Sequence, residues 1–179
     1  SAGTGKTYTT VLKMKKEIKD NKTYKTLAAI TFTRKAAEEI KERIGIVNNE
    51  EFIGTNDSFV LIEIIQPFIY DVYGKEYKIE IKPSYNTEDV IQNFSDGILK
   101  IKTSGLLCKY EDNRKNFPFE LAIEILKNSK SCKRYLKSKY SRIYIDEYQD
   151  CDYDMHKLFM YICDELKIEL FIVGDMKQS

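Results

Sequence analysis

The chain has 179 residues, of which 42% are hydrophobic and 32% are charged, and its formal net charge is +1. These values are typical of a soluble globular protein with one real core and room for a subdomain. No apolar run approaches the ~20 residues of a membrane span and no signal-peptide pattern is present, so we expect a cytoplasmic protein without a membrane partner.

The chain begins in a glycine-rich segment, residues 1–7, that matches most of the phosphate-binding pattern G-x-x-x-x-G-K-[ST]. Gly5, Lys6 and Thr7 take its last three positions. The leading glycine would fall one residue before Ser1, so we expect a longer protein. Such a loop points backbone N–H groups at nucleotide phosphates, while its lysine reaches the β/γ-phosphates and its threonine helps to hold Mg²⁺.

A helix and a buried strand are expected after this loop. Val11, Leu12, Met14 and Ile18 stand at helical spacing, which predicts one apolar helix face. Residues 26–32 form a short apolar run and predict a buried strand.

The next helix has recognisable ends. Thr33 is an N-cap residue, and the Ala-, Glu- and Lys-rich residues 34–44 predict a helix that stops at Gly45. Glu39 and Arg43 should form an i,i+4 pair on it.

The middle of the chain is less regular. Residues 52–55 suggest a second short strand, and residues 58–70 an apolar helix up to a break at Pro67. Residues 71–120 indicate a mostly helical insertion broken by glycines and prolines, and residues 119–140 one or two helices.

The last third returns to alternating elements. Residues 142–145 predict a strand that ends at Asp146, residues 157–166 a helix, and residues 170–173 a strand that ends at Gly174 and Asp175. Strands that alternate with helices indicate an α/β fold with a parallel sheet covered on both faces, and ligands bind at the carboxyl edge of such a sheet.

Cysteine and histidine do not suggest a metal site. Cys108, Cys132, Cys151 and Cys163 lack C-x-x-C spacing, and His156 stands in an apolar-periodic stretch that is typical of a helix. We therefore expect free thiols and no zinc.

Charge is unevenly distributed. Residues 109–142 contain ten Lys/Arg against four acids, whereas residues 146–179 contain nine acids against three lysines. Two interpretations stay open: ordinary solvated helix faces, or a basic face for nucleic acid beside an acidic, metal-handling segment.

Reactive groups follow the expected strands. Asp146, at the end of an apolar strand on the same edge as the phosphate loop, would bind Mg²⁺, and Glu147 would polarise the attacking water. Gln178 would sense the γ-phosphate. Alone, Asp146 and Glu147 would read as a surface acidic pair; combined with Lys6 and Thr7 they indicate a nucleoside-triphosphate site.

Five segments, in this order, resemble motifs I, Ia, Ib, II and III of superfamily 1 helicases of the UvrD/Rep/PcrA type. They are residues 3–7, 31–40, 54–59, 145–150 and 173–179. A finer resemblance, carried by residues 53–71 and 148–156, is to the UvrD-like subunits of the Gabija anti-phage system.

The resemblance implies a RecA-like P-loop NTPase domain of type 1A, residues 1–65 and 135–179, with a mostly helical 1B-type insertion, residues 66–134. It implies ATP and Mg²⁺ as cofactors and 3′-to-5′ movement along single-stranded or partially double-stranded DNA. It also implies a partner, which would be a nuclease of the OLD family, and a second RecA-like domain with arginine fingers after Ser179.

The resemblance also assigns site residues. The catalytic residues would be Lys6, Glu147 and Gln178. The nucleotide would contact Ala2, Gly3, Thr4, Gly5, Lys6, Thr7 and Tyr8. The metal ligands would be Thr7 and Asp146. The single-strand track would be lined by Thr31, Phe32, Thr33, Arg34, Thr55, Asn56, Asp57 and Ser58. Phe32 could stack on any base, or it could be a core aromatic at a strand end.

The sequence and the resemblance are consistent with two functions. The first is an ATP-dependent DNA helicase or translocase in anti-phage defence or DNA repair. The second is a nucleotide- and DNA-sensing ATPase that licenses a partner nuclease without processive unwinding.

Overall fold

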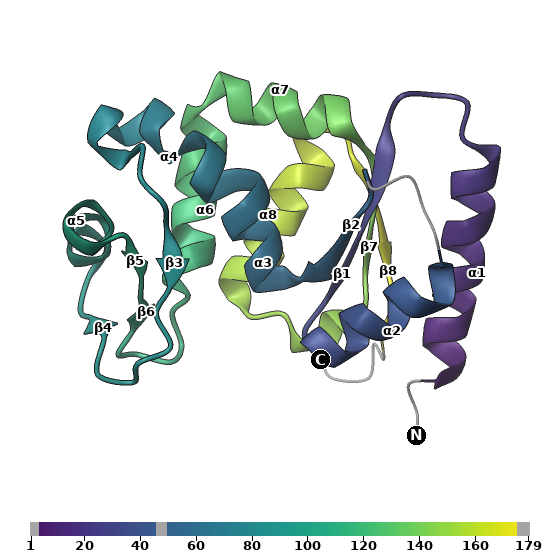
Figure 1. Ribbon diagram of the computed structural model, residues 1–179, viewed down its shortest axis with the longest axis horizontal. Helices are drawn as coiled ribbons and strands as arrows, with labels where there is room; N and C mark the ends of the chain where they lie inside the picture. Colours follow the sequence, from purple (N-terminus) through teal and green to yellow (C-terminus); the bar gives the residue numbers. More distant parts are fainter. Residues whose placement is uncertain (1–3, 46–49, 175–179) are drawn as a thin grey trace. The chain divides into compact units, whose positions relative to one another are not determined.

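The computed structural model describes residues 4–45 and 50–174 (Figure 1). The chain divides into two compact units. Unit 1 contains residues 1–59, 135–151 and 161–179, and unit 2 contains residues 60–134 and 152–160. The predicted insertion was residues 66–134, so unit 2 also includes the six residues before it and a later segment.

Unit 1 contains a four-stranded parallel sheet in the order β2-β1-β7-β8. Its strands are β1 (Thr26–Thr31), β2 (Phe52–Thr55), β7 (Tyr140–Ile145) and β8 (Glu169–Ile172). The predicted α/β fold with a parallel sheet is confirmed. Every residue of β1 is buried, as expected for a strand between two neighbours and two covered faces.

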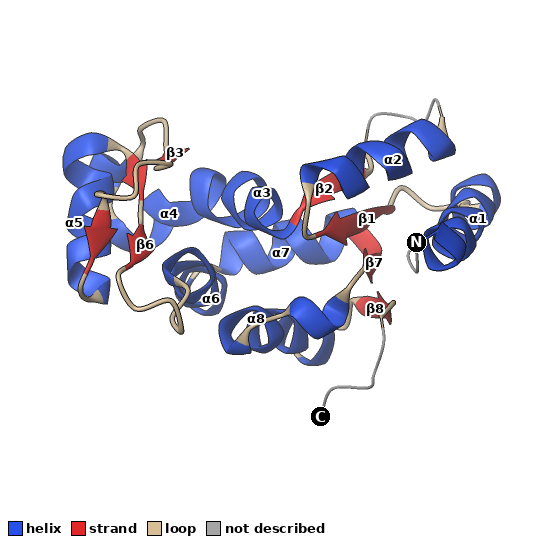
Figure 2. Ribbon diagram, turned by 90° about the horizontal axis from the view of Figure 1, so that it is seen from below, coloured by secondary structure: helices blue, strands red, loops and turns tan. Residues whose placement is uncertain are grey.

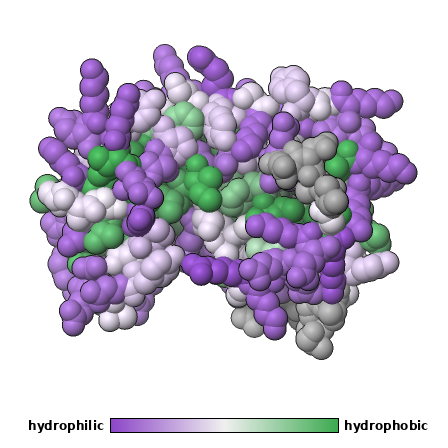
Figure 3. Space-filling view, in the orientation of Figure 1, coloured by the Kyte–Doolittle hydropathy of each residue, from purple (hydrophilic) through white to green (hydrophobic). Residues whose placement is uncertain are grey.

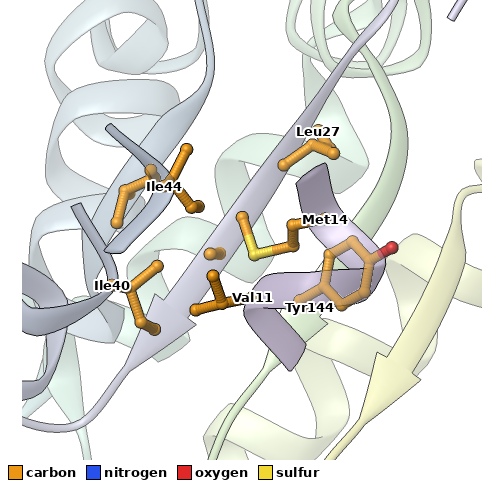
Figure 4. Close-up of a cluster of buried hydrophobic side chains, with 8 residues drawn as sticks. Val11, Met14, Leu27, Ile40, Ile44 and Tyr144 are labelled. Atoms are coloured by element: carbon orange, nitrogen blue, oxygen red, sulfur yellow. The ribbon is translucent and has the colours of Figure 1, made fainter. Parts of the chain in front are cut away.

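Helices α1 (Thr4–Asp20) and α2 (Arg34–Ile44) supply apolar side chains to one face of this sheet (Figure 4). The core cluster consists of Val11, Met14, Leu27, Ala29, Ile40, Ile44, Ile53 and Tyr144. The prediction that Leu12 shares the apolar face of α1 is wrong, since 48% of Leu12 is exposed. Val11 and Met14 are three residues apart and face the sheet together, whereas Leu12 is rotated about 100° from Val11.

The opposite face of the sheet carries the alternate residues of the same strands, which include Ala28, Ile30 and Ile143, all buried. Helix α3 (Asn56–Val60) contributes Phe59, whose ring centroid lies 6.1 Å from that of Tyr140. Both faces are therefore covered.

The ends of α2 confirm the predicted caps. The Thr33 hydroxyl oxygen accepts a hydrogen bond from the Ala36 N–H at 3.1 Å, and Gly45 ends the helix with a φ of 79°. Arg43 and Glu39 form the expected ion pair at 2.7 Å. The main effect of these contacts is to fix where the chain enters and leaves α2.

The predicted break at Pro67 is wrong. After α3 the chain forms a π-helical segment, Leu61–Ile65, and then α4 (Gln66–Tyr73), with Pro67 in the first turn of α4. The Gln66 N–H bonds to the carbonyl of Leu61, five residues back. This wider turn gives the proline ring room, and proline needs no N–H at the start of a helix.

Unit 2 is mainly helical but also contains short strands (Figure 2). Its helices include α5 (Phe94–Ser104), α6 (Phe117–Asn128), the first half of α7 (Lys130–Lys139) and the 3-10 turn Lys75–Tyr77. Two parallel two-stranded sheets pair β3 (Lys82–Pro83) with β5 (Leu106–Leu107) and β4 (Val90–Ile91) with β6 (Lys109–Tyr110). Two residues per strand are too few for sequence periodicity to reveal them.

Helix α8 (Tyr153–Asp164) begins four residues earlier than predicted. Its first residues belong to unit 2, where Asn116 joins the N-termini of α6 and α8. The Asn116 side-chain oxygen accepts from the Phe119 N–H at 3.3 Å, and its Nδ2 donates to Asp152 at 2.9 Å. Asp152 in turn accepts from the Met155 N–H at 2.8 Å, so each residue caps its own helix and they bond to each other.

A membrane-spanning helix is not found among the helices in the described ranges, because none combines enough length with enough apolar character.

We expect Asn116→Ala to lower the free energy of unfolding by about 1–2 kcal/mol, because α6 loses its N-cap side chain and Asp152, which caps α8, loses its bond to Asn116. Asn128→Ala is the matched control, since Asn128 is exposed and bonds only within α6, to the Glu124 carbonyl. Urea denaturation of both variants gives the comparison. Equal losses would show that Asn116 does no more than an ordinary surface amide.

Candidate nucleotide-binding site

The carboxyl ends of the four parallel strands are level with one another. Ile30 pairs with Ile145, Ile145 pairs with Ile172, and Thr31 pairs with Thr55. The residues that follow these strands therefore lie along one edge of the sheet, the edge at which ligands bind in open parallel sheets.

The first turn of α1 carries the predicted phosphate-binding residues Gly5, Lys6, Thr7 and Tyr8. A Cβ built on Gly5 would have no atom of the other described residues within 4 Å, leaving aside its chain neighbours and the backbone of its own helix. The N-terminus of a helix attracts anions through its free N–H groups and its dipole, and backbone without a side chain lets phosphate approach closely.

Of the other residues predicted to contact the nucleotide, Thr4 and Tyr8 are described by the structure and Ala2 and Gly3 are not. Thr4 is the first residue of α1. Tyr8 is 58% exposed and supports no core contact. Thr9 and Thr10 bond back to the carbonyls of Gly5 and Lys6, both at 3.0 Å. These two hydroxyls stabilise the turn that presents Lys6.

Asp146 lies directly after β7 and is 8% exposed. Its N–H donates to the Ile30 carbonyl at 2.9 Å, which extends the pairing of β7 with β1 by one residue. Burial raises the pKa of Asp146, and the charge of Glu147 raises it further, while the Glu147 N–H and the Lys6 charge oppose this shift. A buried carboxylate that interacts with Lys6 is well placed for a divalent cation beside bound phosphates.

The donors present fit Mg²⁺. The Asp146 carboxylate and the Thr7 hydroxyl supply oxygen, which Mg²⁺ prefers. Within residues 4–45 and 50–174, no cluster of three His, Cys, Asp or Glu side chains could hold a metal ion. Mg²⁺ in nucleotide sites is usually held by one or two carboxylates together with waters and substrate phosphates.

Glu147 has an unusual backbone conformation, with φ 55° and ψ 43°, in the left-handed region that side chains other than glycine seldom adopt. Such strain is commonly found at functional sites. The Gln149 side-chain amide donates to the Glu147 carboxylate. Gln149 therefore orients Glu147, and sequence reasoning did not single out this role.

Gly174, after β8, lies against Gln149. A Cβ built on Gly174 would be 2.2 Å from the Gln149 side-chain oxygen and 3.1 Å from the Tyr148 nitrogen. The Tyr148 N–H also donates to the Val173 carbonyl at 3.1 Å. The turn after β7 is thus held against the end of β8, and only glycine leaves space for the Gln149 amide.

An open pocket of about 510 Å³ lies between the start of α1 and the end of β8. Its lining residues are Gly5, Lys6, Thr9, Thr10, Phe171, Ile172, Val173 and Gly174. The volume is within the range of small-ligand sites. Asp146 does not line this pocket, and Asp175 and Gln178, predicted to follow β8, lie outside the described residues.

The predicted DNA residues after β1 differ in accessibility. Thr31 is buried, and its hydroxyl donates to the Thr33 carbonyl at 2.9 Å. Phe32 is half-buried, so its ring is neither fully enclosed in the core nor fully exposed for stacking on a base. Thr33 and Arg34 are exposed. Thr31 therefore shapes the turn, while the next three residues present its surface.

The predicted DNA residues after β2 also divide. The Thr55 hydroxyl accepts from the Ser58 N–H at 3.2 Å and donates to the Ser58 hydroxyl at 3.0 Å, so Thr55 caps α3. Asn56 is buried and Asp57 is exposed. Threonine is a common N-cap residue, and its place directly before a helix is the signal that could have predicted this cap.

The amino-acid sequence of the chain is similar to those of known proteins. Residues 1–179 match the sequence profile of a family described as AAA domain. The Gabija protein GajB of Bacillus cereus (strain VD045) is 49% identical over 178 residues, which cover 99% of this chain and 36% of that protein.

Two further relatives are named as subunits of an ATP-dependent helicase/nuclease. The one from Lactobacillus acidophilus (strain ATCC 700396 / NCK56 / N2 / NCFM) is 27% identical over 122 residues, covering 62% of this chain and 10% of that protein. The one from Syntrophomonas wolfei subsp. wolfei (strain DSM 2245B / Goettingen) is 27% identical over 165 residues, which cover 87% of this chain and 12% of that protein. The chain thus spans only a minor part of each relative's length.

We expect Gly174→Ala to lower the free energy of unfolding by about 1–3 kcal/mol, because the added methyl group would overlap the Gln149 amide. Replacing Gln149 by Ala in the same chain should recover the part of the loss that comes from this overlap, while the strain of alanine at the Gly174 φ of 157° remains. Thermal melting of the wild type, both single variants and the double variant completes the cycle. Additive effects would contradict the proposed contact.

Proposed function

The chain belongs to the AAA domain family, in the form of the N-terminal region of UvrD-like helicases, and from this premise we propose that it is the ATP-binding part of an ATP-dependent DNA helicase or translocase. The family supports an enzyme of the ATPase or helicase type. One arrangement carries the proposal: the residues of the phosphate-loop pattern stand in the first turn of α1, and buried Asp146 follows β7 at the carboxyl edge of the sheet on which α1 packs.

We assign the phosphates of ATP to the first turn of α1. Lys6 would bind the β/γ-phosphates, and the space beside Gly5 would admit a phosphate oxygen. Thr7 and Asp146 would hold Mg²⁺, which supplies positive charge against the phosphates when bound. Residues 2–5 and Tyr8 would complete the nucleotide contacts.

Glu147 would orient and polarise the attacking water. Its carboxylate receives the Gln149 amide, which limits its side-chain freedom before substrate arrives. Gln178, beyond the described residues, would bind the γ-phosphate and report its loss. Because Gln149 also lies against Gly174, the segment after β8 is coupled sterically to the orientation of Glu147.

We propose that DNA contacts the turn after β1 and the start of α3. Phe32, Thr33 and Arg34 offer a partly exposed ring, a hydroxyl and a cation, which suit a base, a sugar–phosphate backbone and a phosphate. Thr31, Thr55 and buried Asn56 would act by shaping these turns. Asp57 and Ser58 remain in the proposed track, where Asp57 would need a polar rather than a phosphate partner.

We propose that unit 1 corresponds to domain 1A and unit 2 to the 1B-type insertion of such motors. The resemblance to the Gabija protein GajB supports a role in anti-phage defence, with DNA as substrate. Movement in the 3′-to-5′ direction is part of this proposal.

The second candidate is a nucleotide- and DNA-sensing ATPase that licenses a partner nuclease, for which we propose the OLD family. The names of two relatives combine helicase and nuclease, which favours association with a cleavage activity. The residues described here are the same in both candidates, since both require ATP and DNA.

We expect Lys6→Ala or Glu147→Gln to reduce the DNA-stimulated ATPase activity of the intact protein about 100-fold or more, since each removes a group that acts on the transferred phosphoryl or the water. Glu147→Gln should keep nucleotide binding, whereas Lys6→Ala should weaken it. Phosphate release and nucleotide titration measure these effects. Lys16→Ala, on the exposed surface of α1, is the control, and undiminished activity in either site variant would refute the assigned roles.

The two candidate functions separate in a strand-displacement assay run beside a partner-dependent cleavage assay. A motor should displace a labelled strand only with ATP, and Glu147→Gln should abolish displacement. Cleavage that depends on the partner and on ATP, without displacement, would favour the sensing ATPase instead.

A further inference from the structure

Helix α7 (Lys130–Lys139) has an unusual charge content: half of its ten residues are Lys or Arg, and none is acidic. Lys130, Lys133, Arg134 and Lys137 stand at positions i, i+3, i+4 and i+7, which places them on one face of the helix. Lys130, Arg134 and Lys137 are exposed and Lys133 is half-buried. Figure 3 shows hydrophilic side chains at the surface over α7, which Figure 1 draws at the top.

The other side of α7 faces protein, because Cys132 and Leu136 are fully buried. Lys139, outside the basic face, is already engaged, since its ammonium group donates to the Tyr135 hydroxyl at 3.0 Å. The four residues of the basic face are therefore directed away from the core of the protein.

Two other cations in the same basic stretch, Arg142 and Arg114, have acidic partners. Arg142 bonds to Glu169 at 2.6 Å and to Glu17 at 3.3 Å, and its hydrogen bond to Glu169 is the main cause of its raised pKa. Arg114 is paired with Asp112. In contrast, the basic face of α7 has no ion pair with any acid in residues 4–45 and 50–174.

We propose that the basic face of α7 binds the phosphate backbone of duplex DNA. Uncompensated Lys and Arg along a helix complement a regular array of phosphates, and their binding releases counterions. The face carries no aromatic side chain for stacking, which single strands with exposed bases would require. A duplex, whose bases are stacked inside, presents only phosphates to such a surface.

This contact is separate from the proposed nucleotide site and single-strand track. Helix α7 leads into β7 at Tyr140, the amino end of that strand, while Asp146 follows its carboxyl end. Six residues of strand separate Tyr140 and Asp146 by about 20 Å. The basic face of α7 would thus be a second DNA-binding surface of the proposed motor, in addition to the single-strand track.

The test uses the intact protein without nucleotide and the double variant Lys130→Gln/Arg134→Gln, which removes two charges and keeps unbranched polar side chains of similar helix propensity. Binding to a blunt synthetic DNA duplex and to an oligo-dT strand is followed by fluorescence anisotropy between about 50 and about 200 mM salt. The variant should bind the duplex more weakly, with the slope of log K against log salt reduced by about 2. Binding to oligo-dT and ATPase activity stimulated by oligo-dT should not change.

The matched control is Lys15→Gln/Lys16→Gln, which removes the same charge from the exposed side of α1. Three results would overturn the inference: an unchanged duplex slope, an equal loss in the control variant, or an equal loss on oligo-dT. Absence of duplex binding by the wild type would also overturn it. The proposed function fails separately, if oligo-dT does not stimulate ATP hydrolysis by the wild type.

Discussion

The pairing of β7 with β1 is the constraint on which the candidate site depends. These two central strands are parallel and in register from Ala28 opposite Ile143 to Ile30 opposite Ile145, and the pairing continues through the Asp146 N–H. Because β1 and residues 143–145 of β7 are buried, a shift by one residue would turn core side chains to the wrong face. Core packing thus sets the position of Asp146 relative to the first turn of α1.

A second consequence concerns the long excursion between β2 and β7, which contains most of unit 2. The two ends of this segment are fixed by β2 and β7, which are strands of the sheet, while the residues between them are held by contacts within unit 2. The side-chain bridge between Asn116, in this excursion, and Asp152, which comes after β7, links the start of α6 to the start of α8 within unit 2. Helix α8 follows the segment that carries Glu147 and Gln149, so this bridge lies only a few residues along the chain from the proposed catalytic group.

Sequence reasoning succeeded where local signals agree with tertiary packing. The cap at Thr33 and the stop at Gly45 depend on neighbours a few residues away, and both were found. The strand at residues 52–55 was also found, although it is defined by pairing with β1. Sequence reasoning failed at Pro67, where a π-turn widens the helix, and at Leu12, where the sheet meets a narrower stripe of α1 than apolar spacing suggests. The two-residue strands of unit 2 were missed because backbone pairing between distant segments, and no periodic pattern, defines them.

The sequence alone determined which chemical groups are present and where they stand along the chain. These groups are the lysine and threonine of a phosphate loop, an aspartate and a glutamate after an apolar run, and a basic stretch before that apolar run. Those assignments rest on local pattern, which spacing along the chain preserves. Only the tertiary structure decided how each group is used. It showed that Thr31 and Thr55 are occupied in shaping turns, and that Gln149 bonds to Glu147 against Gly174. It also distinguished Arg142, paired with Glu17 and Glu169, from the basic face of α7, which has no acidic partner among the described residues. The reason is physical: burial, pairing and clearance are relations between residues far apart in the chain, which exist only once the strands are aligned.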